Sequence, residues 1–273
     1  MGLFICPVCA QALKRKEKVY ICKNNHCFDI SAKGYTNLLP ANRKNSAVPG
    51  DDKDMVTARN LFLSKGYYSN LREKLEEIAV KYTPDQPKVL DCGCGEGYYT
   101  QGIAEALQKS GKQAETVGID ISKDAARLGA KRTNHADFAV ASSLNLPKKR
   151  DSIDLLVNCF SPLCVPEFHR VLKKGGSFIY VVPGENHLWE LKCELYEKPY
   201  KNEEKQTEYD GFLYREVVKT EKDIFLEDGD AIQNLFKMTP YVWKTPQKDR
   251  ERLLDKQTLK VHTEFCIHIY TKK

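Results

Sequence analysis

The sequence predicts an α/β protein, in which a small N-terminal module that binds zinc precedes a doubly wound, mostly parallel sheet. Three observations carry this prediction. From residue 88 onward, short apolar runs alternate with helical segments, the pattern of a parallel sheet with helices on both faces. A glycine-rich turn follows the first apolar run. Cysteines and a histidine with metal-ligand spacing open the chain.

Length and composition fit one large globular domain with a small module. The chain has 273 residues, of which 41% are hydrophobic and 29% are charged. These values exclude a disordered, collagen-like or coiled-coil chain. The apolar runs fall far short of the ~20 residues that span a bilayer, and the N-terminus lacks the apolar run of a signal peptide. We therefore expect a cytoplasmic protein with no membrane partner.

Apolar residues at helical spacing predict two helices, over residues 54–65 and 71–82, after a polar linker. The expected buried strands are 89–90, 116–119, 138–141, 153–159 and 177–182. The expected later helices are 98–108, 123–132, 167–172, 231–237 and 249–256. Residues 261–270 alternate in polarity and predict an antiparallel edge strand. Residues 190–230 are charged and without periodicity. Their interspersed tyrosines can line an RNA surface, although such stretches are more often solvated.

Ten cysteines in a chain expected in a reducing compartment favour metal binding over disulfides. Cys6, Cys9, Cys22 and His26 have the spacing C-x2-C-x12-C-x3-H. This pattern predicts one tetrahedral zinc ion with a structural role. Cys27 could take the place of His26, because residue types alone allow either a nitrogen or a sulfur to complete the site. The side chains of adjacent residues diverge, so only one of the two is expected to bind, and we prefer His26.

The net charge of +6 lies entirely in the first fifty residues, which hold eight Lys and Arg and two carboxylates. The basic residues are Lys14, Arg15, Lys16, Lys18, Lys23, Lys33, Arg43 and Lys44. A short basic module on a neutral body favours a polyanionic partner. The alternative is an ordinary solubilising surface.

The turn at residues 91–97 starts with Asp91 and carries the pattern G-x-G-x-G, which includes Gly93 and Gly95. The next predicted strand ends in Asp120. Such a turn with a following acid occurs in proteins that bind nicotinamide dinucleotides and in proteins that bind S-adenosylmethionine (SAM). The chemistry of the two ligands distinguishes between these possibilities.

Three residues favour SAM. A dinucleotide site needs a small residue where this chain has Tyr98, and Asp91 would stand beside the pyrophosphate. SAM carries no phosphate, and its ammonium and sulfonium suit an acid at the strand end. Asp120 would accept the ribose hydroxyls, while the glycines allow the backbone to approach the ligand closely.

Longer stretches resemble class I SAM-dependent methyltransferases: DCGCGEGYYT at 91–100, FHRVLKKGG at 168–176 and PGENHL at 183–188. With the zinc pattern, GYTNLLP at 34–40, PGD at 49–51 and MTP at 238–240, the resemblance narrows to the RlmA type. These are the methyltransferases of guanine N1 in large-subunit ribosomal RNA. The resemblance covers nearly the whole chain.

The resemblance implies a seven-stranded Rossmann-like sheet, SAM as cofactor, one structural Zn²⁺, and 23S ribosomal RNA as partner. It places zinc ligands at Cys6, Cys9, Cys22 and His26. It places cofactor contacts at Tyr68, Asp91, Gly93, Gly95, Tyr99, Thr100, Asp120 and His187. The expected activity is transfer of a methyl group to N1 of a guanine. Because the deep groove of regular A-form RNA is unreadable, we expect that guanine in a hairpin loop.

The expected domains are a zinc-binding RNA-recognition module at 1–38, a linker with helices at 39–83, and a SAM-dependent methyltransferase domain at 84–273. No DNA partner is expected, and a homodimer is left open. One rival hypothesis is a methyltransferase that acts on tRNA or a small molecule. The other is a non-catalytic zinc-ribbon protein that binds RNA.

The sequence nominates no catalytic residue. Many methyltransferases of exocyclic amines carry [D/N]-P-P-[Y/F] after the fourth strand, but this chain has Asn158-Cys159-Phe160-Ser161-Pro162. The departure is compatible with methylation of a ring nitrogen. Phe160 is interpreted as a core residue, with stacking on a base as the alternative.

The basic N-terminus generates a prediction about salt. Changing Lys14, Arg15, Lys16 and Lys18 to Gln should weaken RNA binding and flatten its salt dependence, with each lost contact removing ~0.7–0.9 from the log–log slope. The affinity for SAM should not change. RNA affinities at several salt concentrations, with a matched SAM titration, measure both effects. An unchanged slope would mean that these side chains only solvate the surface.

Overall fold

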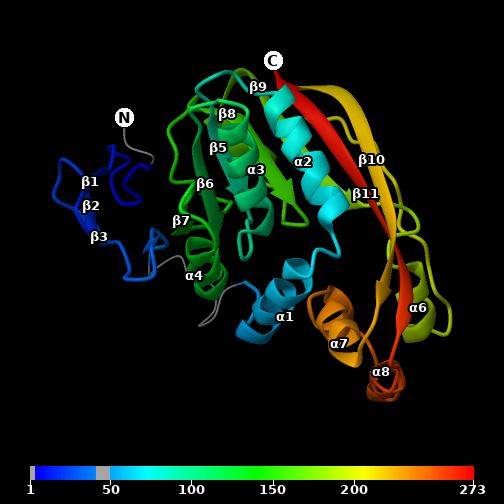
Figure 1. Ribbon diagram of the computed structural model, residues 1–273. Coiled ribbons are helices and arrows are strands. Elements are labelled where there is room, and N and C mark those ends of the chain that lie inside the picture. Colours follow the sequence, from blue (N-terminus) through cyan, green and yellow to red (C-terminus); the bar gives the residue numbers. More distant parts are fainter. Residues whose placement is uncertain (1–3, 41–49) are drawn as a thin grey trace.

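The computed structural model describes residues 4–40 and 50–273, and most of these pack around an eight-stranded sheet (Figure 1). In spatial order its strands are β10 (Phe212–Leu226), β11 (Leu259–Lys272), β9 (Leu172–Pro183), β8 (Ile153–Cys159), β5 (Lys88–Cys92), β6 (Glu115–Asp120), β7 (Asp137–Val140) and β4 (Tyr35–Asn37). From β9 to β4 the neighbours are parallel, and β11 is antiparallel to β9 and β10. The predicted doubly wound, mostly parallel α/β fold is confirmed.

Helices cover both faces of the sheet. They are α1 (Lys53–Ser64), α2 (Ser69–Lys81), α3 (Tyr98–Lys109), α4 (Lys123–Arg132), α5 (Val165–Val171), α6 (Trp189–Leu195), α7 (Gly229–Lys237) and α8 (Gln247–Leu254). Strand β8 shows the division, because Leu155 and Val157 join the apolar cluster under α2 and α3, while Leu156 joins the one under α5. Within the described ranges, no helix is long and apolar enough to cross a bilayer.

The N-terminal module is a three-stranded antiparallel sheet of β1 (Lys14–Lys16), β2 (Val19–Ile21) and β3 (Cys27–Asp29). It is joined to the large sheet by direct contacts. The amide of Ile5 donates to the carbonyl of Pro147 at 2.9 Å, and Lys148 lies over the ring of Phe4. Phe4 and Tyr20 are buried in the apolar cluster that also holds strand residues of the sheet. The module and the sheet therefore share one core.

The expectation of seven strands is wrong by one, because residues that follow β3 in the N-terminal module add a strand to the large sheet. Strand β4 lies parallel to β7, with Tyr35 opposite Phe138. The division of the chain after residues 38 and 83 stays a prediction, and the first boundary falls directly after this strand. The predicted linker falls mainly on residues 41–49, which lie outside the described residues.

The predicted edge position of residues 261–270 is also wrong. Strand β11 is antiparallel as expected, but β10 pairs with its outer side over most of its length. Strand β10 was missed because its sequence, FLYREVVKTEKDIFL, mixes charged residues into both faces, as a solvated edge strand does. The short helix α6 was missed with it. The segment 190–230 thus contains ordered structure where no periodicity indicated any.

Packing around Phe138 fixes the approach of four elements to one another. A Cβ atom placed on Gly129 of α4 would lie 2.5 Å from the Phe138 ring, and one on Gly118 of β6 would lie 2.7 Å from it. On Gly97, at the start of α3, the distance to that ring would be 3.1 Å. The ring thus occupies the space that three side chains would otherwise take.

This packing predicts that Gly stabilises α4 more than Ala does at position 129, the reverse of their usual order in helices. Gly129→Ala should lower the free energy of unfolding by about 1–3 kcal/mol through overpacking, although Ala normally favours a helix by about 1 kcal/mol over Gly. Lys131→Ala, at an exposed position of the same helix, is the matched control and should cause no loss. Urea unfolding measures both variants. Equal or greater stability of Gly129→Ala would show that the ring can move aside.

Candidate functional site

The four predicted metal ligands come together in the N-terminal module. Their ligand atoms, from Cys6, Cys9, Cys22 and His26, all lie within 4.8 Å of one another. The Sγ atoms of Cys6 and Cys22 are each 3.5 Å from Nδ1 of His26, and Sγ of Cys9 is 3.7 Å from Sγ of Cys22. The turn before β1 supplies Cys6 and Cys9, and the turn between β2 and β3 supplies Cys22 and His26.

Zinc fits this donor set. A tetrahedral ion with Zn–S bonds of about 2.3 Å holds its sulfur atoms about 3.8 Å apart, close to the spacing observed. The structure includes His26 in the cluster and leaves Cys27 out. The Cys27 side chain is exposed, and its thiol donates to the carbonyl of Asn25 at 3.4 Å. The four side chains would hold a closed, structural ion.

Asp91 is a fully buried carboxyl group at the end of β5. The hydroxyl of Thr100 donates to its Oδ2 at 2.6 Å, while its Oδ1 has no hydrogen-bond partner among the described residues. Burial raises the pKa of Asp91 to about 7, with a further rise from nearby Asp120 and an opposing effect of the Thr100 hydrogen bond. A cationic ligand group at Oδ1 would restore the ionised form.

The carboxylate of Asp120 is held in place by the backbone. Its Oδ2 accepts from the amide of Gly95 at 2.9 Å, and its Oδ1 accepts from the amide of Ser122 at 2.8 Å. Gly93 and Gly95 both have positive φ, at +80° and +54°, so the turn depends on glycine at these positions. Asp120 is therefore fixed beside the turn, with lone pairs left to accept ribose hydroxyls.

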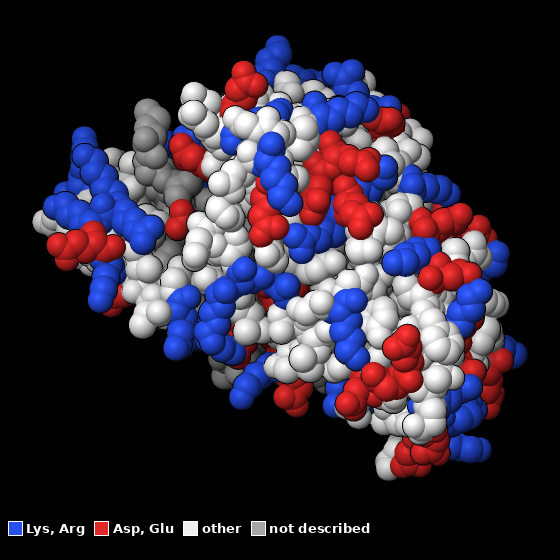
Figure 2. Space-filling model, viewed as in Figure 1, with Lys and Arg blue, Asp and Glu red and all other residues white. Residues whose placement is uncertain are grey.

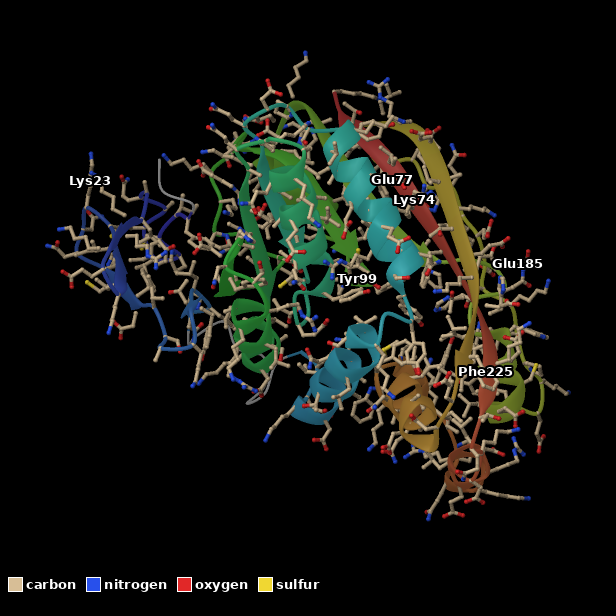
Figure 3. All side chains as sticks on the ribbon, in the orientation of Figure 1. Lys23, Lys74, Glu77, Tyr99, Glu185 and Phe225 are labelled. Atoms are coloured by element: carbon tan, nitrogen blue, oxygen red, sulfur yellow. The ribbon has the colours of Figure 1, made fainter. Side chains whose placement is uncertain are left out.

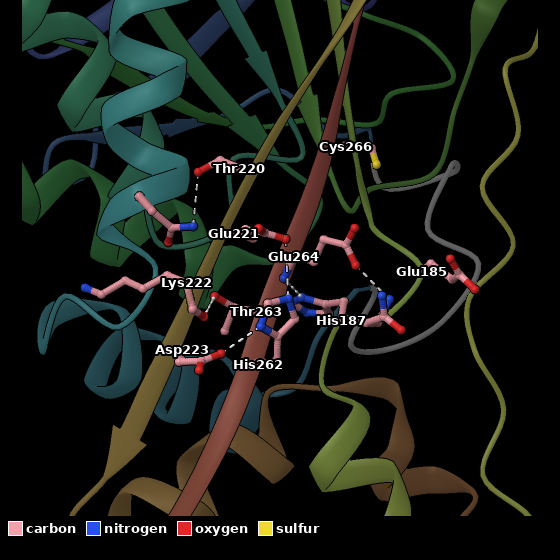
Figure 4. A network of polar contacts seen from close by, with 12 residues as sticks. Glu185, His187, Thr220, Glu221, Lys222, Asp223, His262, Thr263, Glu264 and Cys266 are labelled. Atoms are coloured by element: carbon pink, nitrogen blue, oxygen red, sulfur yellow. Dashed lines mark hydrogen bonds and ion pairs between the residues drawn. The ribbon is translucent and has the colours of Figure 1, made fainter.

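Tyr68 and His187 form a hydrogen-bonded pair. Nδ1 of His187 accepts from the amide of Glu264 at 3.2 Å (Figure 4). Its Nε2 lies 3.4 Å from the Tyr68 hydroxyl. Burial lowers the pKa of His187 to about 3, so the ring is neutral near pH 7. Because Nδ1 accepts, Nε2 carries the proton and donates to Tyr68. The Tyr68 hydroxyl proton is left to donate elsewhere.

Buried polar atoms without partners gather around the turn. They belong to Asp91 (Oδ1), Tyr99 (hydroxyl) and Asn158 (Oδ1), and none has a hydrogen-bond partner within the part of the chain that the structure describes. Tyr99, which is labelled in Figure 3, is buried. Such atoms are costly unless a ligand pairs with them. SAM, with an ammonium and hydroxyl groups, fits this donor and acceptor set.

Sequence reasoning missed Arg59 of α1. Its guanidinium donates to Asp51 Oδ2 at 2.5 Å and to the carbonyl of Met238 at 3.3 Å. Its side chain lies 3.9 Å from the place that a Cβ on Gly95 would take. Burial disfavours the charge, but the neighbouring carboxylates, Asp51 foremost, raise the pKa of Arg59. A single arginine within a helix gave no sequence signal for this position.

The end of β8 and the residue that follows the strand differ in exposure. Asn158 is fully buried, and its Nδ2 donates to the carbonyl of Cys92 at 3.1 Å, which ties β8 to β5. Phe160 is 48% exposed and has a φ of +53°. Its interpretation as a core residue is therefore wrong.

Two tyrosines of residues 190–230, Tyr200 and Tyr209, line a separate hollow. A cavity of about 650 Å³ lies between β9 and the segment 200–209, and its lining includes Tyr180, Tyr200, Tyr209, Lys201 and Lys205. Tyr200 is half exposed. Both interpretations of this segment, as an RNA surface or as a solvated face, stay predictions.

The basic side chains of the N-terminal module are exposed. Lys14, Arg15 and Lys16 make up β1, and all three face solvent. Figure 2 shows Lys and Arg gathered over the module, while the rest of this face mixes both charges. Arg43 and Lys44 lie outside the described residues. The basic surface that is predicted to bind a polyanion is thus exposed at the residues that the structure describes.

Comparisons with known proteins cover both parts of the chain. The model of the RlmA N-terminal zinc ribbon matches residues 4–47, and a methyltransferase domain model matches residues 85–252. The fold is also similar to that of the YcgJ protein from Bacillus subtilis. That structure has a TM-score of 0.52 and 16% identity, and the match covers 74% of this chain and 98% of that one.

Two curated relatives have informative names. The 23S rRNA (guanine(748)-N(1))-methyltransferase of Streptomyces fradiae is 35% identical over 191 residues, which are 68% of this chain and 65% of that protein. YxjB of Bacillus subtilis (strain 168), provisionally named a 23S rRNA (guanine-N(1)-)-methyltransferase, is 31% identical over 262 residues. That match covers 93% of this chain and 91% of YxjB.

The metal cluster predicts distinct effects for two cysteines. Purified wild-type chain should contain one zinc ion, and Cys22→Ala should lose it because three ligands hold zinc far less tightly. Cys27→Ala is the matched control and should keep full zinc, since its thiol points out of the cluster. Elemental analysis measures both, and SAM titration of the variants should show little change. Full zinc in Cys22→Ala would reject the ligand set.

Burial of Asp91 predicts a pH effect on stability. The unfolded carboxyl ionises near pH 3.8 and the folded one near 7, so its contribution is fully present below about pH 4 and is lost as pH rises to 7. At pH 8 and without cofactor, Asp91→Asn should therefore be more stable than wild type by a few kcal/mol.

The same substitution should weaken SAM binding, because it removes the charge that the ligand's ammonium would meet. Urea unfolding at pH 4 to 8 and SAM calorimetry measure the two effects. Asp85→Asn, at an exposed acid, controls for the loss of one charge. If the free energies of unfolding of Asp91→Asn and wild type change in parallel across this pH range, the raised pKa of Asp91 is contradicted.

Proposed function

Because the chain belongs to the RlmA-type family of methyltransferases, we propose that it methylates N1 of a guanine in a hairpin loop of 23S ribosomal RNA, with SAM as methyl donor. The names of the two relatives support this substrate. The matched models support it from both ends of the chain, since one describes the zinc ribbon and the other the methyltransferase domain.

One observation carries the proposal: the basic zinc module shares its core and a sheet edge with the domain that holds the cofactor site. Strand β4 pairs with β7, and Ile5 is hydrogen-bonded to Pro147. RNA phosphates that contact the exposed lysines and arginine of β1 would thus be held in a fixed relation to the glycine turn. Such phosphate contacts position a nucleic acid.

The proposed cofactor residues divide the work between charge and orientation. When bound, SAM supplies an electrophilic methyl group. Asp91 would meet its ammonium, Asp120 its ribose hydroxyls, and Tyr68 would donate its hydroxyl proton to an acceptor on the ligand. Thr100 orients Asp91, and His187 orients Tyr68. Alignment of the methyl group with the extruded base would contribute much of the rate.

The proposal has consequences for partners and location. The partner is 23S ribosomal RNA, and neither DNA nor a membrane takes part. The reaction belongs in the cytoplasm, where ribosomal RNA is available and cysteine thiols stay reduced for zinc. No side chain is assigned as the base that removes the N1 proton.

Primer extension tests the function. After incubation with the chain and SAM, 23S RNA from cells that lack the gene should stop reverse transcriptase at one guanine, because N1 methylation blocks the Watson–Crick edge. Asp120→Ala should greatly reduce the stop, since the ribose hydroxyls lose their acceptor at a cost of about 1–3 kcal/mol. RNA from cells with the gene should show the same stop.

The rival functions give different results in this assay. Methylation of tRNA, with no stop in 23S RNA, would make tRNA the substrate. SAM binding without transfer to either RNA would favour a small-molecule substrate. Binding of RNA with no measurable SAM affinity would leave a non-catalytic RNA-binding protein.

A further inference from the structure

Phe160 combines two features that are unusual in a phenylalanine. It directly follows β8, and 48% of its surface is exposed. Its backbone has a φ of +53°, in the left-handed region that bulky residues rarely adopt. Its amide donates to the carbonyl of Val181 at 3.3 Å, which ties this conformation to the neighbouring strand. Strained residues of this kind gather at functional sites.

The surroundings of Phe160 place it beside the cofactor site. Its ring centroid lies 5.8 Å from that of Phe265, which in turn lies 4.9 Å from the Tyr68 ring and 4.7 Å from the His187 ring. On the other side, Ser161 packs against the glycine turn, because a Cβ on Gly93 would come within 2.1 Å of its hydroxyl oxygen. Phe160 thus contacts the aromatic group next to Tyr68 and His187, and its neighbour Ser161 contacts the glycine turn.

Neither packing nor cofactor binding explains the exposed ring. The buried partner Phe265 already fills the core behind it, with none of its own surface exposed. A flat apolar ring cannot pair with the unsatisfied oxygens of Asp91 and Asn158. It can stack on a planar heterocycle, and every nucleobase has a face suited to this.

We propose that Phe160 is the stacking platform for the base that receives the methyl group, an inference that rests on the proposed function. A purine extruded from an RNA loop would lie against the exposed ring, at the same end of the sheet as Asp91 and Asp120. The ring would hold the plane of the base, and other groups would read its edges. Phe160 is therefore a substrate-binding residue with no part in proton transfer.

Substitution by glycine makes a sharp test, because glycine adopts positive φ without strain. Phe160→Gly should fold with stability equal to or above wild type, so loss of the fold cannot mimic loss of the platform. With 23S RNA as substrate, kcat/KM should fall about 5- to 150-fold, the range that corresponds to one base–aromatic stack. The Kd for SAM should stay within about twofold.

Two further variants complete the test. Phe160→Trp should keep kcat/KM within a few fold, since its ring offers an equal or larger face. Phe225→Ala, at an exposed phenylalanine on the outer strand β10 (Figure 3), should leave all parameters unchanged. These two variants separate a stacking requirement from a general effect of exposed aromatic rings.

Three outcomes would overturn the proposal. Wild-type kcat/KM in Phe160→Gly would show that the ring does not touch the substrate. A parallel loss of SAM affinity in that variant would place the ring on the cofactor. If wild-type chain leaves 23S RNA unmethylated in the primer-extension assay, the proposed function fails and this inference fails with it. Only the first two outcomes leave the function intact.

Discussion

The ring of Phe138 occupies space that glycines leave open, and the geometry of the site depends on this contact. Gly97, Gly118 and Gly129 come from the turn, β6 and α4, and a side chain on any of them would meet the ring. Because these three glycines have no side chains, the turn can approach β6, the strand that ends in Asp120. The amide of Gly95 then reaches the Asp120 carboxylate at 2.9 Å. Close packing of apolar atoms thus sets the positions of polar ones.

Function and stability oppose each other at Asp91. A carboxyl group in a dry position favours its neutral form, and its unpaired oxygen adds to the cost of folding. A cationic ligand would turn both features into binding energy. Bound cofactor stabilises the native state by mass action, so the free chain is the less stable form. The pair of Thr100 and Asp91 shows that the chain offsets only part of this cost itself.

What the sequence could predict follows from how local each signal is. Spacing along the chain identifies the metal ligands Cys6, Cys9, Cys22 and His26. Continuous apolar runs predict the buried parallel strands. Strand β10 is half solvated and charged, so its pattern resembles a loop. Arg59 joins the site only because α1 packs over the turn, which no short stretch of sequence encodes. The sequence predicts a core position for Phe160, because hydrophobicity does not reveal backbone strain.

The pairing of β4 with β7 has a consequence for synthesis on the ribosome. Tyr35 lies opposite Phe138, about one hundred residues later in the chain. Because a chain emerges from its N-terminus, the zinc-binding segment is complete long before its neighbour in the sheet exists. Metal capture can therefore precede formation of the sheet. In the interval β4 exposes an unpaired edge, which makes the nascent chain vulnerable to wrong strand partners until residue 140 has left the ribosome.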